Sequence, residues 1–208
     1  MTDISEEWQP VYVGIMQEIV LRGRVIETLF SEDLELGIRP RFEFCHLELR
    51  MMCELFAISS LIAHGDIPAT QSKRIESIWQ ADRLLRTMSH LHPDFFPAAT
   101  KVTIDENGSM AVLDRPEAIV TKDEVIELYN ECGNVLHRGN LKTFGQIETN
   151  TDDFFRSRWW GQRLNSLALS HTISAYGSGA QTLWHVTVSD DEYLKPRILK
   201  LTRLPPAH

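Results

Sequence analysis

The sequence predicts an α+β protein that is mainly helical: a helical core of about five helices, an inserted β-hairpin and a small C-terminal antiparallel sheet. Three observations lead to this class. Apolar residues recur every three or four positions over most of the chain before residue 138, which is the period of an amphipathic helix. An Asn-Gly pair at Asn107 separates two short strand-like runs. Beyond residue 172 the apolar residues alternate with polar ones, as in strands.

Two long helices are expected first. Residues 11–36 carry apolar side chains at helical spacing, and we expect Gly37 and Pro40 to end that helix. Residues 41–64 form the second helix, which we expect to be the most buried because apolar residues cover most of its circumference. One of its apolar stripes consists of Phe44, Leu47, Met51, Leu55, Ile58 and Ile62.

A third helix is expected over residues 72–89, followed by a loop over residues 90–99. The hairpin then pairs residues 101–104 with residues 110–113 across the Asn-Gly turn. Thr121 and Glu124 have the spacing of a capping box, which predicts the start of the fourth helix.

The fourth helix is expected to run to about His137, with Gly139 as its C-terminal stop. The fifth covers about residues 152–170, and strands follow at residues 183–188 and 198–202, with Gly177 and Gly179 in a turn before them. In domain terms, the helical core with its hairpin at about 101–113 occupies residues 1–150. Residues 151–208 hold the last helix and the sheet, and we expect them to pack with the core as one domain.

Composition indicates a cytoplasmic protein. The three cysteines lack CxxC spacing, and two of them lie in an apolar helical pattern, which favours free thiols in a reducing compartment: Cys45, Cys53 and Cys132. The first ten residues are acidic and carry no apolar signal-peptide core. The longest apolar stretch, residues 55–63, is too short to cross a bilayer, so we expect no membrane association.

The formal net charge of −8 argues against nonspecific coating of nucleic acid, because that affinity comes from neutralising phosphates with Lys and Arg. Two local basic groups are still able to bind phosphates. One lies in the fifth helix and the other near the C-terminus: Arg156, Arg158 and Arg163, and Lys195, Arg197, Lys200 and Arg203.

A polar lane crosses the second helix. Glu43, His46, Arg50 and Glu54 are spaced three, four and four residues apart, so they share one side of it. Ionisable groups on so apolar a helix must be paired, because unpaired buried charges are costly. One interpretation is a structural network in which Arg50 bridges Glu54 and Glu43. The alternative is a site in which His46 is an acid or base and Arg50 binds an anion.

The fourth helix offers a second candidate. Tyr129, Gly133 and His137 lie four residues apart and share a face. A glycine in a helix interior costs about 1 kcal/mol relative to alanine, which close approach of a helix or ligand usually offsets. His137 either caps the helix beside a tight crossing or lies in a small groove lined by Gly133 and Tyr129.

These two helices together carry a resemblance to a known family. A helical hairpin with a polar lane, and a late helix that ends in a histidine, resembles the HEPN superfamily over about residues 11–140. The resemblance implies a helical core that dimerises. Members cleave RNA without a metal through an Arg and a His on one late helix, four to six residues apart. The matching positions before His137 are Asn130, Glu131 and Cys132, so only His137 carries over. Arg50 is the hypothetical source of the missing guanidinium.

Arg156, Trp159 and Arg163 share a face of the fifth helix, with Phe155 beside them. An exposed Trp flanked by two Arg is typical of contacts with proteins or single-stranded nucleic acid. The alternative is simple stacking of Arg on a half-buried Trp. The face is therefore a candidate surface for a protein or RNA partner, or for a homodimer.

No cofactor and no metal are predicted. The zinc alternative uses Cys45, His46, Cys132 and His137, but adjacent residues on a helix point about 100° apart, so Cys45 and His46 do not converge on one ion. His90 and His92 converge only if extended. The leading hypothesis is a non-catalytic binding or assembly protein on a HEPN-like core, acting as a homodimer. The alternatives are a metal-independent RNA-processing enzyme using His137 with Arg50 or His46, and a small-ligand sensor.

Overall fold

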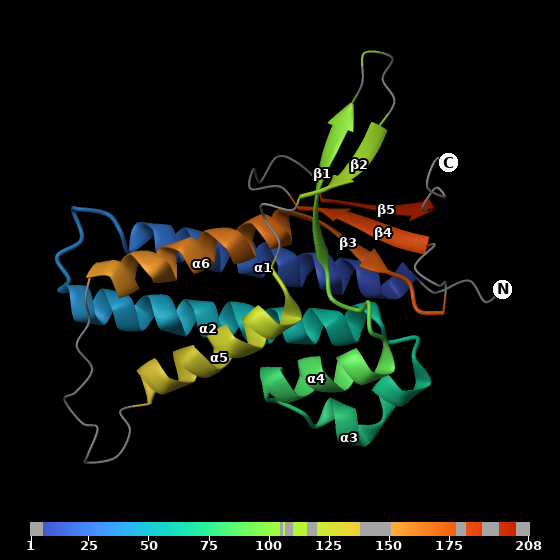
Figure 1. Cartoon of the computed structure of the whole chain (residues 1–208), viewed down its shortest axis with the longest axis horizontal. Coiled ribbons are helices and arrows are strands. Elements are labelled where there is room, and N and C mark those ends of the chain that lie inside the picture. Colours follow the sequence, from blue (N-terminus) through green and yellow to red (C-terminus); the bar gives the residue numbers. More distant parts are fainter. Residues whose placement is uncertain are drawn as a thin grey trace.

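The computed structural model confirms an α+β fold that is mainly helical (Figure 1). It describes residues 6–104, 106, 110–115, 120–137, 151–177, 182–188 and 196–202. The helices are α1 (Gln9–Thr28), α2 (Ile38–Ala63), α3 (Lys73–Glu76), α4 (Ala81–Leu91), α5 (Lys122–Leu136) and α6 (Thr151–Leu169). Helices α1, α2 and α6 lie side by side, α5 packs on α2, and α3 and α4 lie on the side of α2 away from the sheet (Figure 1).

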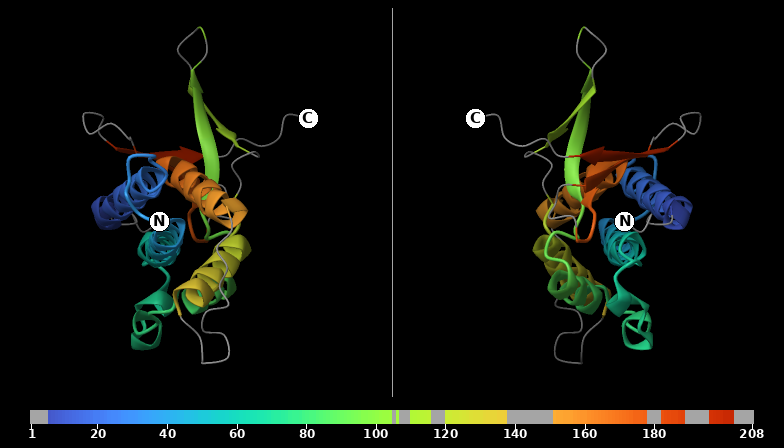
Figure 2. Two further views of the ribbon diagram at one scale, coloured as in Figure 1. Left: turned by 90° about the vertical axis from the view of Figure 1, so that its left-hand side faces the viewer. Right: turned by 90° about the vertical axis from the view of Figure 1, so that its right-hand side faces the viewer.

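A single antiparallel sheet has the strand order β2-β1-β3-β4-β5. Its strands are β1 (Ala98–Ile104), β2 (Met110–Asp114), β3 (Ser170–Ser174), β4 (Thr182–Thr187) and β5 (Arg197–Thr202). The predicted hairpin is therefore present as β1 and β2, and it projects from the helices in Figures 1 and 2. It also joins the C-terminal strands, since Ala99 of β1 lies opposite His171 of β3. The turn glycines Gly108 and Gly179 lie outside the described residues.

Two glycines allow α1 and α6 to cross closely. A Cβ on Gly23 would lie 3.0 Å from the Asn165 side chain, and a Cβ on Gly161 would lie 3.0 Å from Ile26. Each glycine therefore accommodates a side chain of the other helix, and the two packed helices form one wall of the core.

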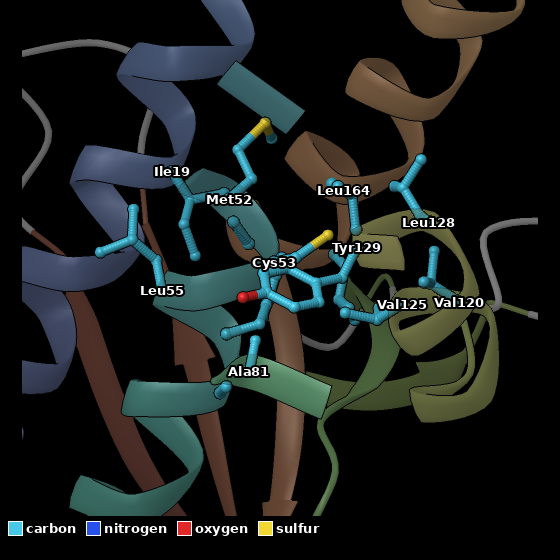
Figure 3. Close-up of a cluster of buried hydrophobic side chains, with 14 of the residues drawn as sticks. Ile19, Met52, Cys53, Leu55, Ala81, Val120, Val125, Leu128, Tyr129 and Leu164 are labelled. Atoms are coloured by element: carbon cyan, nitrogen blue, oxygen red, sulfur yellow. The ribbon is translucent and has the colours of Figure 1, made fainter. Parts of the chain in front are cut away.

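The core lies where α2 meets α1, α5, α6 and the start of α4 (Figure 3). Tyr129 of α5 lies beside Cys53 of α2 in this view, with Ala81 of α4 next to them. All three cysteines are free and buried, and burial raises the pKa of the Cys132 thiol to about 12. They serve as small apolar core residues.

The first helix ends earlier than the sequence indicates. Its periodicity predicted a helix over residues 11–36, but α1 stops at Thr28. The Arg41 side chain, from the first turns of α2, donates to the carbonyl oxygens of Leu29 and Ser31. These bonds satisfy carbonyls that a longer helix would have used.

Pro40 belongs to the second helix rather than ending the first. Gly37 is the N-cap of α2, and Pro40 occupies its first turn, where the missing N–H has no intrahelical acceptor to lose. The prediction that Gly37 and Pro40 stop one helix was wrong, because the same residues start the next one.

The predicted helix over residues 72–89 is broken into α3 and α4. The Ser77 hydroxyl donates to the Arg74 carbonyl, 2.9 Å away, and so competes with continuation of the helix. Gln80 is extended, and Trp79 lies in the break with 75% of its surface exposed.

The later helices match the prediction closely. Thr121 caps α5 as expected: its hydroxyl accepts from the Glu124 N–H at 3.2 Å, and a Glu124 carboxylate oxygen accepts from the Thr121 N–H at 2.8 Å. Helix α6 begins and ends within one residue of the predicted 152–170. Gly139, the predicted stop of α5, lies outside the described residues.

The second helix has more buried residues than any other described helix, as predicted, but part of one of its apolar stripes is exposed. On the stripe that contains Phe44, that residue is 48% exposed and Ile58 is 45% exposed, and Leu47 is exposed as well. The core is built instead on the other side of α2, with Cys45, Leu49 and Phe56 fully buried. The stripe is therefore divided: Phe44, Leu47 and Ile58 face outward, whereas Leu55 of the same stripe is buried.

Candidate functional site

The polar lane of α2 is divided among different partners. Glu43 accepts from Arg39 at 3.3 Å, whereas Arg50 pairs with Glu54 at 3.3 Å. The predicted bridge from Arg50 to Glu54 is present, but Glu43 is turned to the helix start instead of to Arg50. The lane is therefore not one continuous network.

Arg50 reaches α5 and contacts Tyr129 and Gly133, two of the three residues predicted to share a face of that helix. A terminal guanidinium nitrogen donates to the Tyr129 hydroxyl at 2.7 Å, and the guanidinium carbon lies 4.1 Å from the centre of the Tyr129 ring. A Cβ on Gly133 would lie 3.0 Å from the other terminal nitrogen, so the glycine provides the space for this contact. The Arg50 side chain is 20% exposed. Arg50, Glu54, Tyr129 and Gly133 therefore form an inter-helix clamp.

His46 lies elsewhere, at the junction of α2, α5 and α6. It is 2% exposed, and its Nδ1 donates to the Phe42 carbonyl at 3.0 Å, which leaves Nε2 facing Glu131 at 3.9 Å. Burial lowers the pKa of His46, although the Phe42 carbonyl and Glu131 oppose this effect. The ring is therefore neutral at pH 7. Glu131 also forms an ion pair with Arg156 of α6.

Each of the three arginines predicted as a basic group on α6 is paired with an acidic residue of another helix. Arg156 pairs with Glu131 of α5, Arg158 with Glu27 of α1, and Arg163 with Glu124 of α5. These ion pairs largely neutralise the positive charge of the three side chains, so this group is poorly suited to bind a phosphate.

The structure does bring Trp159 and Arg163 together. The Arg163 guanidinium lies 4.5 Å from the centre of the Trp159 ring and 4.9 Å from that of Trp160. Trp159 and Phe155 remain exposed on the outer side of α6. Stacking of Arg on Trp was the alternative interpretation to a partner surface. An exposed Trp that stacks on Arg is compatible with both interpretations.

His137 is exposed at the end of α5, where its backbone N–H donates to the Gly133 carbonyl at 3.0 Å. Arg50 meets α5 one turn earlier, with its nitrogens engaged by Tyr129 and Glu54. His46 is closed off from solvent. The three residues predicted as catalytic thus divide into one exposed histidine, one clamped arginine and one buried neutral histidine.

Two groups of residues escaped sequence reasoning. Glu131 joins the polar lane to α6, a link between separate helices that no local spacing reveals. The second group lines a hollow of about 530 Å³ on the surface of α3 and α4: Arg74, Ser77, Ile78, Trp79, Gln80, Arg83, Arg86, Thr87 and His90. Part of its signal was visible in the sequence as Arg83 and Arg86, which lie three residues apart and so share one helix face.

Among the described residues, no group of three or more His, Cys, Asp or Glu side chains is placed to hold a metal ion. Within the same part of the chain, none of the helices has the length and apolar character that crossing a membrane requires.

Comparisons with known proteins give no relative. No protein-family model matches the sequence, no curated protein is significantly similar to it, and no solved structure matches it at the same level.

Proposed function

We propose that the protein is a non-catalytic assembly module that acts as a homodimer, paired through the outer side of α1 and α2. This side, called the α1–α2 face below, carries exposed apolar residues from both helices: Val11, Leu21 and Val25 of α1, and Phe44, Leu47 and Ile58 of α2. The observation that carries the proposal is the exposed part of the apolar stripe of α2, which no element within the described residues covers. Figure 2 shows no described element over this side of the two helices.

The α1–α2 face is shaped as well as apolar. A hollow of about 260 Å³ opens on it, lined mainly by apolar side chains that include Val25, Leu36 and Phe44, with Thr28 and Glu48 among them. In a two-fold dimer the same patch meets itself, so each copy offers both the hollow and the Phe44 ring at its rim. A self-complementary surface of this kind favours a second copy of the chain as the partner.

Gly14 lies on the same side of α1 as Val11 and Leu21, and a Cβ added to it would meet nothing within 4 Å. A glycine inside a helix costs about 1 kcal/mol relative to alanine. Nothing within the described chain offsets that cost. Close approach of a partner helix at Gly14 would offset this cost, because the missing side chain lets the two helix backbones come together.

Charge at this face is compatible with self-association. Although the chain has a net charge of −8, Arg22 is bonded to both Glu18 and Glu48, and Arg39 is bonded to Glu43. In a two-fold interface, each charged residue comes near the same residue of the second chain, and the repulsion between like charges is costly where they are unpaired. Pairing within the chain reduces that cost.

The face is large enough for a stable dimer. Two adjacent helix faces, each about 30 Å long and about 10 Å wide, offer about 600 Å² per chain. Stable dimers bury about 600–1,000 Å² per partner, so the face reaches the lower end of this range. The resemblance to HEPN cores, which dimerise, supports the same proposal. The outer side of α6 around Trp159 stays a predicted surface for a further protein partner.

The proposal is tested by measuring molar mass in solution with light scattering after size-exclusion chromatography. We expect the wild type to have twice the chain mass of 23.9 kDa, and Phe44→Glu to shift the mass toward that of one chain. Leu113→Glu is the matched control, because Leu113 is similarly exposed but lies on β2. Circular dichroism checks that the variants are folded. A monomeric wild type at about 100 μM, a concentration well above the dissociation constants of stable dimers, would contradict the proposal.

A further inference from the structure

The hollow on α3 and α4 has an unusual charge composition. Among the lining residues that the structure describes, three are arginines, one is a histidine and none is acidic, in a chain whose net charge is −8. Figure 1 shows α3 and α4 on the side of α2 away from the sheet, so this basic surface is separate from the α1–α6 pair and its ion pairs.

The fold explains why the arginines and the histidine gather there. Arg83, Arg86 and His90 lie three and four residues apart, so they share one face of α4, while the opposite face buries Leu84, Leu85 and Met88. The break between α3 and α4 turns the chain back, and Arg74 of α3 thereby joins the same hollow.

These arginines differ from those of α6 in being unneutralised. Within the part of the chain that the structure describes, no ion pair joins Arg74, Arg83 or Arg86 to a carboxylate, whereas Arg156, Arg158 and Arg163 are all paired. Guanidinium groups present planar sets of donors that match the oxygens of a phosphate. The chemistry of the hollow therefore suits a phosphate group.

Trp79 adds a flat aromatic surface to the same hollow. It lies in the break between the two helices with its side chain 75% exposed, although a large apolar ring is ordinarily at least partly covered. An exposed indole beside arginines is the arrangement on which a nucleobase stacks.

We propose that this hollow binds a nucleotide, with the phosphate held by Arg74, Arg83 and Arg86 and the base stacked on Trp79. Its volume of about 530 Å³ is within the range of small-ligand sites, about 300–1,000 Å³. A free nucleotide fits better than a long nucleic acid. Charges are screened beyond about 8 Å at physiological salt, so a single phosphate responds to the local cations, whereas a long polyanion also meets the acidic remainder of the chain.

The test is isothermal titration calorimetry with four probes: adenosine monophosphate, adenosine, inorganic phosphate and a single-stranded RNA octamer. We expect the monophosphate to bind more tightly than adenosine or phosphate alone, because it alone engages both the arginines and Trp79. Arg83→Ala/Arg86→Ala and Trp79→Ala should each weaken binding by about tenfold or more. Arg197→Ala, an exposed arginine on β5, should leave it unchanged.

Three results would overturn the proposal: no binding of the monophosphate at millimolar concentration, binding that the Arg83/Arg86 and Trp79 variants leave intact, or binding of the octamer more than tenfold tighter than that of the monophosphate. The last result would identify the hollow as a nucleic-acid site. The monomeric Phe44→Glu variant should bind the monophosphate as the wild type does, so failure of the dimer proposal is distinguishable from failure of this one.

Discussion

The guanidinium of Arg50 lies against Gly133, with one terminal nitrogen 3.0 Å from the position that a Cβ of residue 133 would occupy. The same guanidinium donates to Tyr129 and pairs with Glu54. The glycine near the C-terminal end of α5 is thereby explained by a neighbour within the chain. Its cost to the helix is offset by the inter-helix clamp that it makes possible, and no ligand is needed to account for it.

This relationship predicts energetic coupling between the two positions. In an Arg50→Ala background, Gly133→Ala should stabilise the protein by about 1 kcal/mol, the helix-propensity difference. In the wild type the new methyl group displaces the guanidinium from Tyr129 and Glu54, so the gain should be smaller by about 0.5–1 kcal/mol. Urea denaturation of the four proteins measures the coupling. Asn134→Ala, at an exposed position of α5, is the control and should not couple to Arg50→Ala. Equal effects of Gly133→Ala on stability in the wild-type and Arg50→Ala backgrounds would contradict the prediction.

A second prediction concerns Gly14 on the α1–α2 face. Because nothing within 4 Å of its Cβ position obstructs a side chain, Gly14→Leu should stabilise the monomer, measured in the Phe44→Glu background, by about 0.5–1 kcal/mol. In the otherwise wild-type chain the same change should weaken the dimer, because the leucine occupies the space that the partner helix needs. Sedimentation velocity over a dilution series measures the dissociation constant. A dimer as tight as that of the wild type would place the contact elsewhere.

The sequence allowed prediction where structure is determined locally. The Thr121–Glu124 capping box spans a single turn, and both of its hydrogen bonds are present. The hairpin strands were placed correctly because the two strands are close in the sequence, on either side of an Asn-Gly pair. Such features depend on a few adjacent residues, which a sequence pattern contains completely.

Features that depend on distant residues were not predictable. The end of α1 is set by Arg41 from the next helix, and the orientation of Arg156 by Glu131 of α5. The most consequential case is α2, which has two apolar stripes. Periodicity shows both, but which one faces the core depends on where α5 and α6 pack, so the outward position of Phe44 emerged only from the fold.

The alternative hypothesis of RNA cleavage leads to a third prediction. We expect neither the wild type nor His137→Ala to cleave a fluorogenic single-stranded RNA in the presence of EDTA. The reason is that His46 is buried and neutral, and the Arg50 guanidinium is engaged by Tyr129 and Glu54, so neither is free to act with His137 on a phosphodiester. Cleavage by the wild type that disappears in both His137→Ala and Arg50→Ala would reinstate the nuclease hypothesis.

The fourth prediction concerns acid lability from two buried histidines. His171 donates from Nδ1 to the Leu167 carbonyl at 2.8 Å and accepts from the Tyr12 hydroxyl at 2.8 Å, while His64 donates to the Phe95 carbonyl at 3.1 Å. Burial is the main cause that lowers the pKa of each to about 4. Both rings are therefore neutral in the folded protein at pH 7.

The sign of the effect follows from proton binding. An unfolded histidine takes up a proton near pH 6.5, so between about pH 6.5 and pH 4 the unfolded state binds more protons than the folded state, and the free energy of unfolding falls as the pH falls. Each histidine contributes a slope of up to about 1.4 kcal/mol per pH unit in this window. The carboxyls of Glu27 and Glu124 add little there. Burial raises the pKa of both carboxyls, but hydrogen bonds outweigh it, and the net pKa of each is lowered. These hydrogen bonds include one from Arg158 to Glu27 and those from Thr121 and Arg163 to Glu124. The stability that the two carboxyls contribute is therefore lost only below about pH 4.3.

Urea denaturation at pH 7.5, 6.5, 5.5 and 5.0 tests this prediction. The wild type should lose stability steadily below pH 6.5. His64→Gln keeps a donor for the Phe95 carbonyl but removes the titrating ring, so its slope between pH 6.5 and 5.0 should be shallower by up to about 1.4 kcal/mol per pH unit, whatever its stability at pH 7.5. The dependence on pH, rather than the absolute stability, is thus the diagnostic quantity. A variant slope equal to that of the wild type would mean that His64 is protonated in the folded protein as readily as in the unfolded chain.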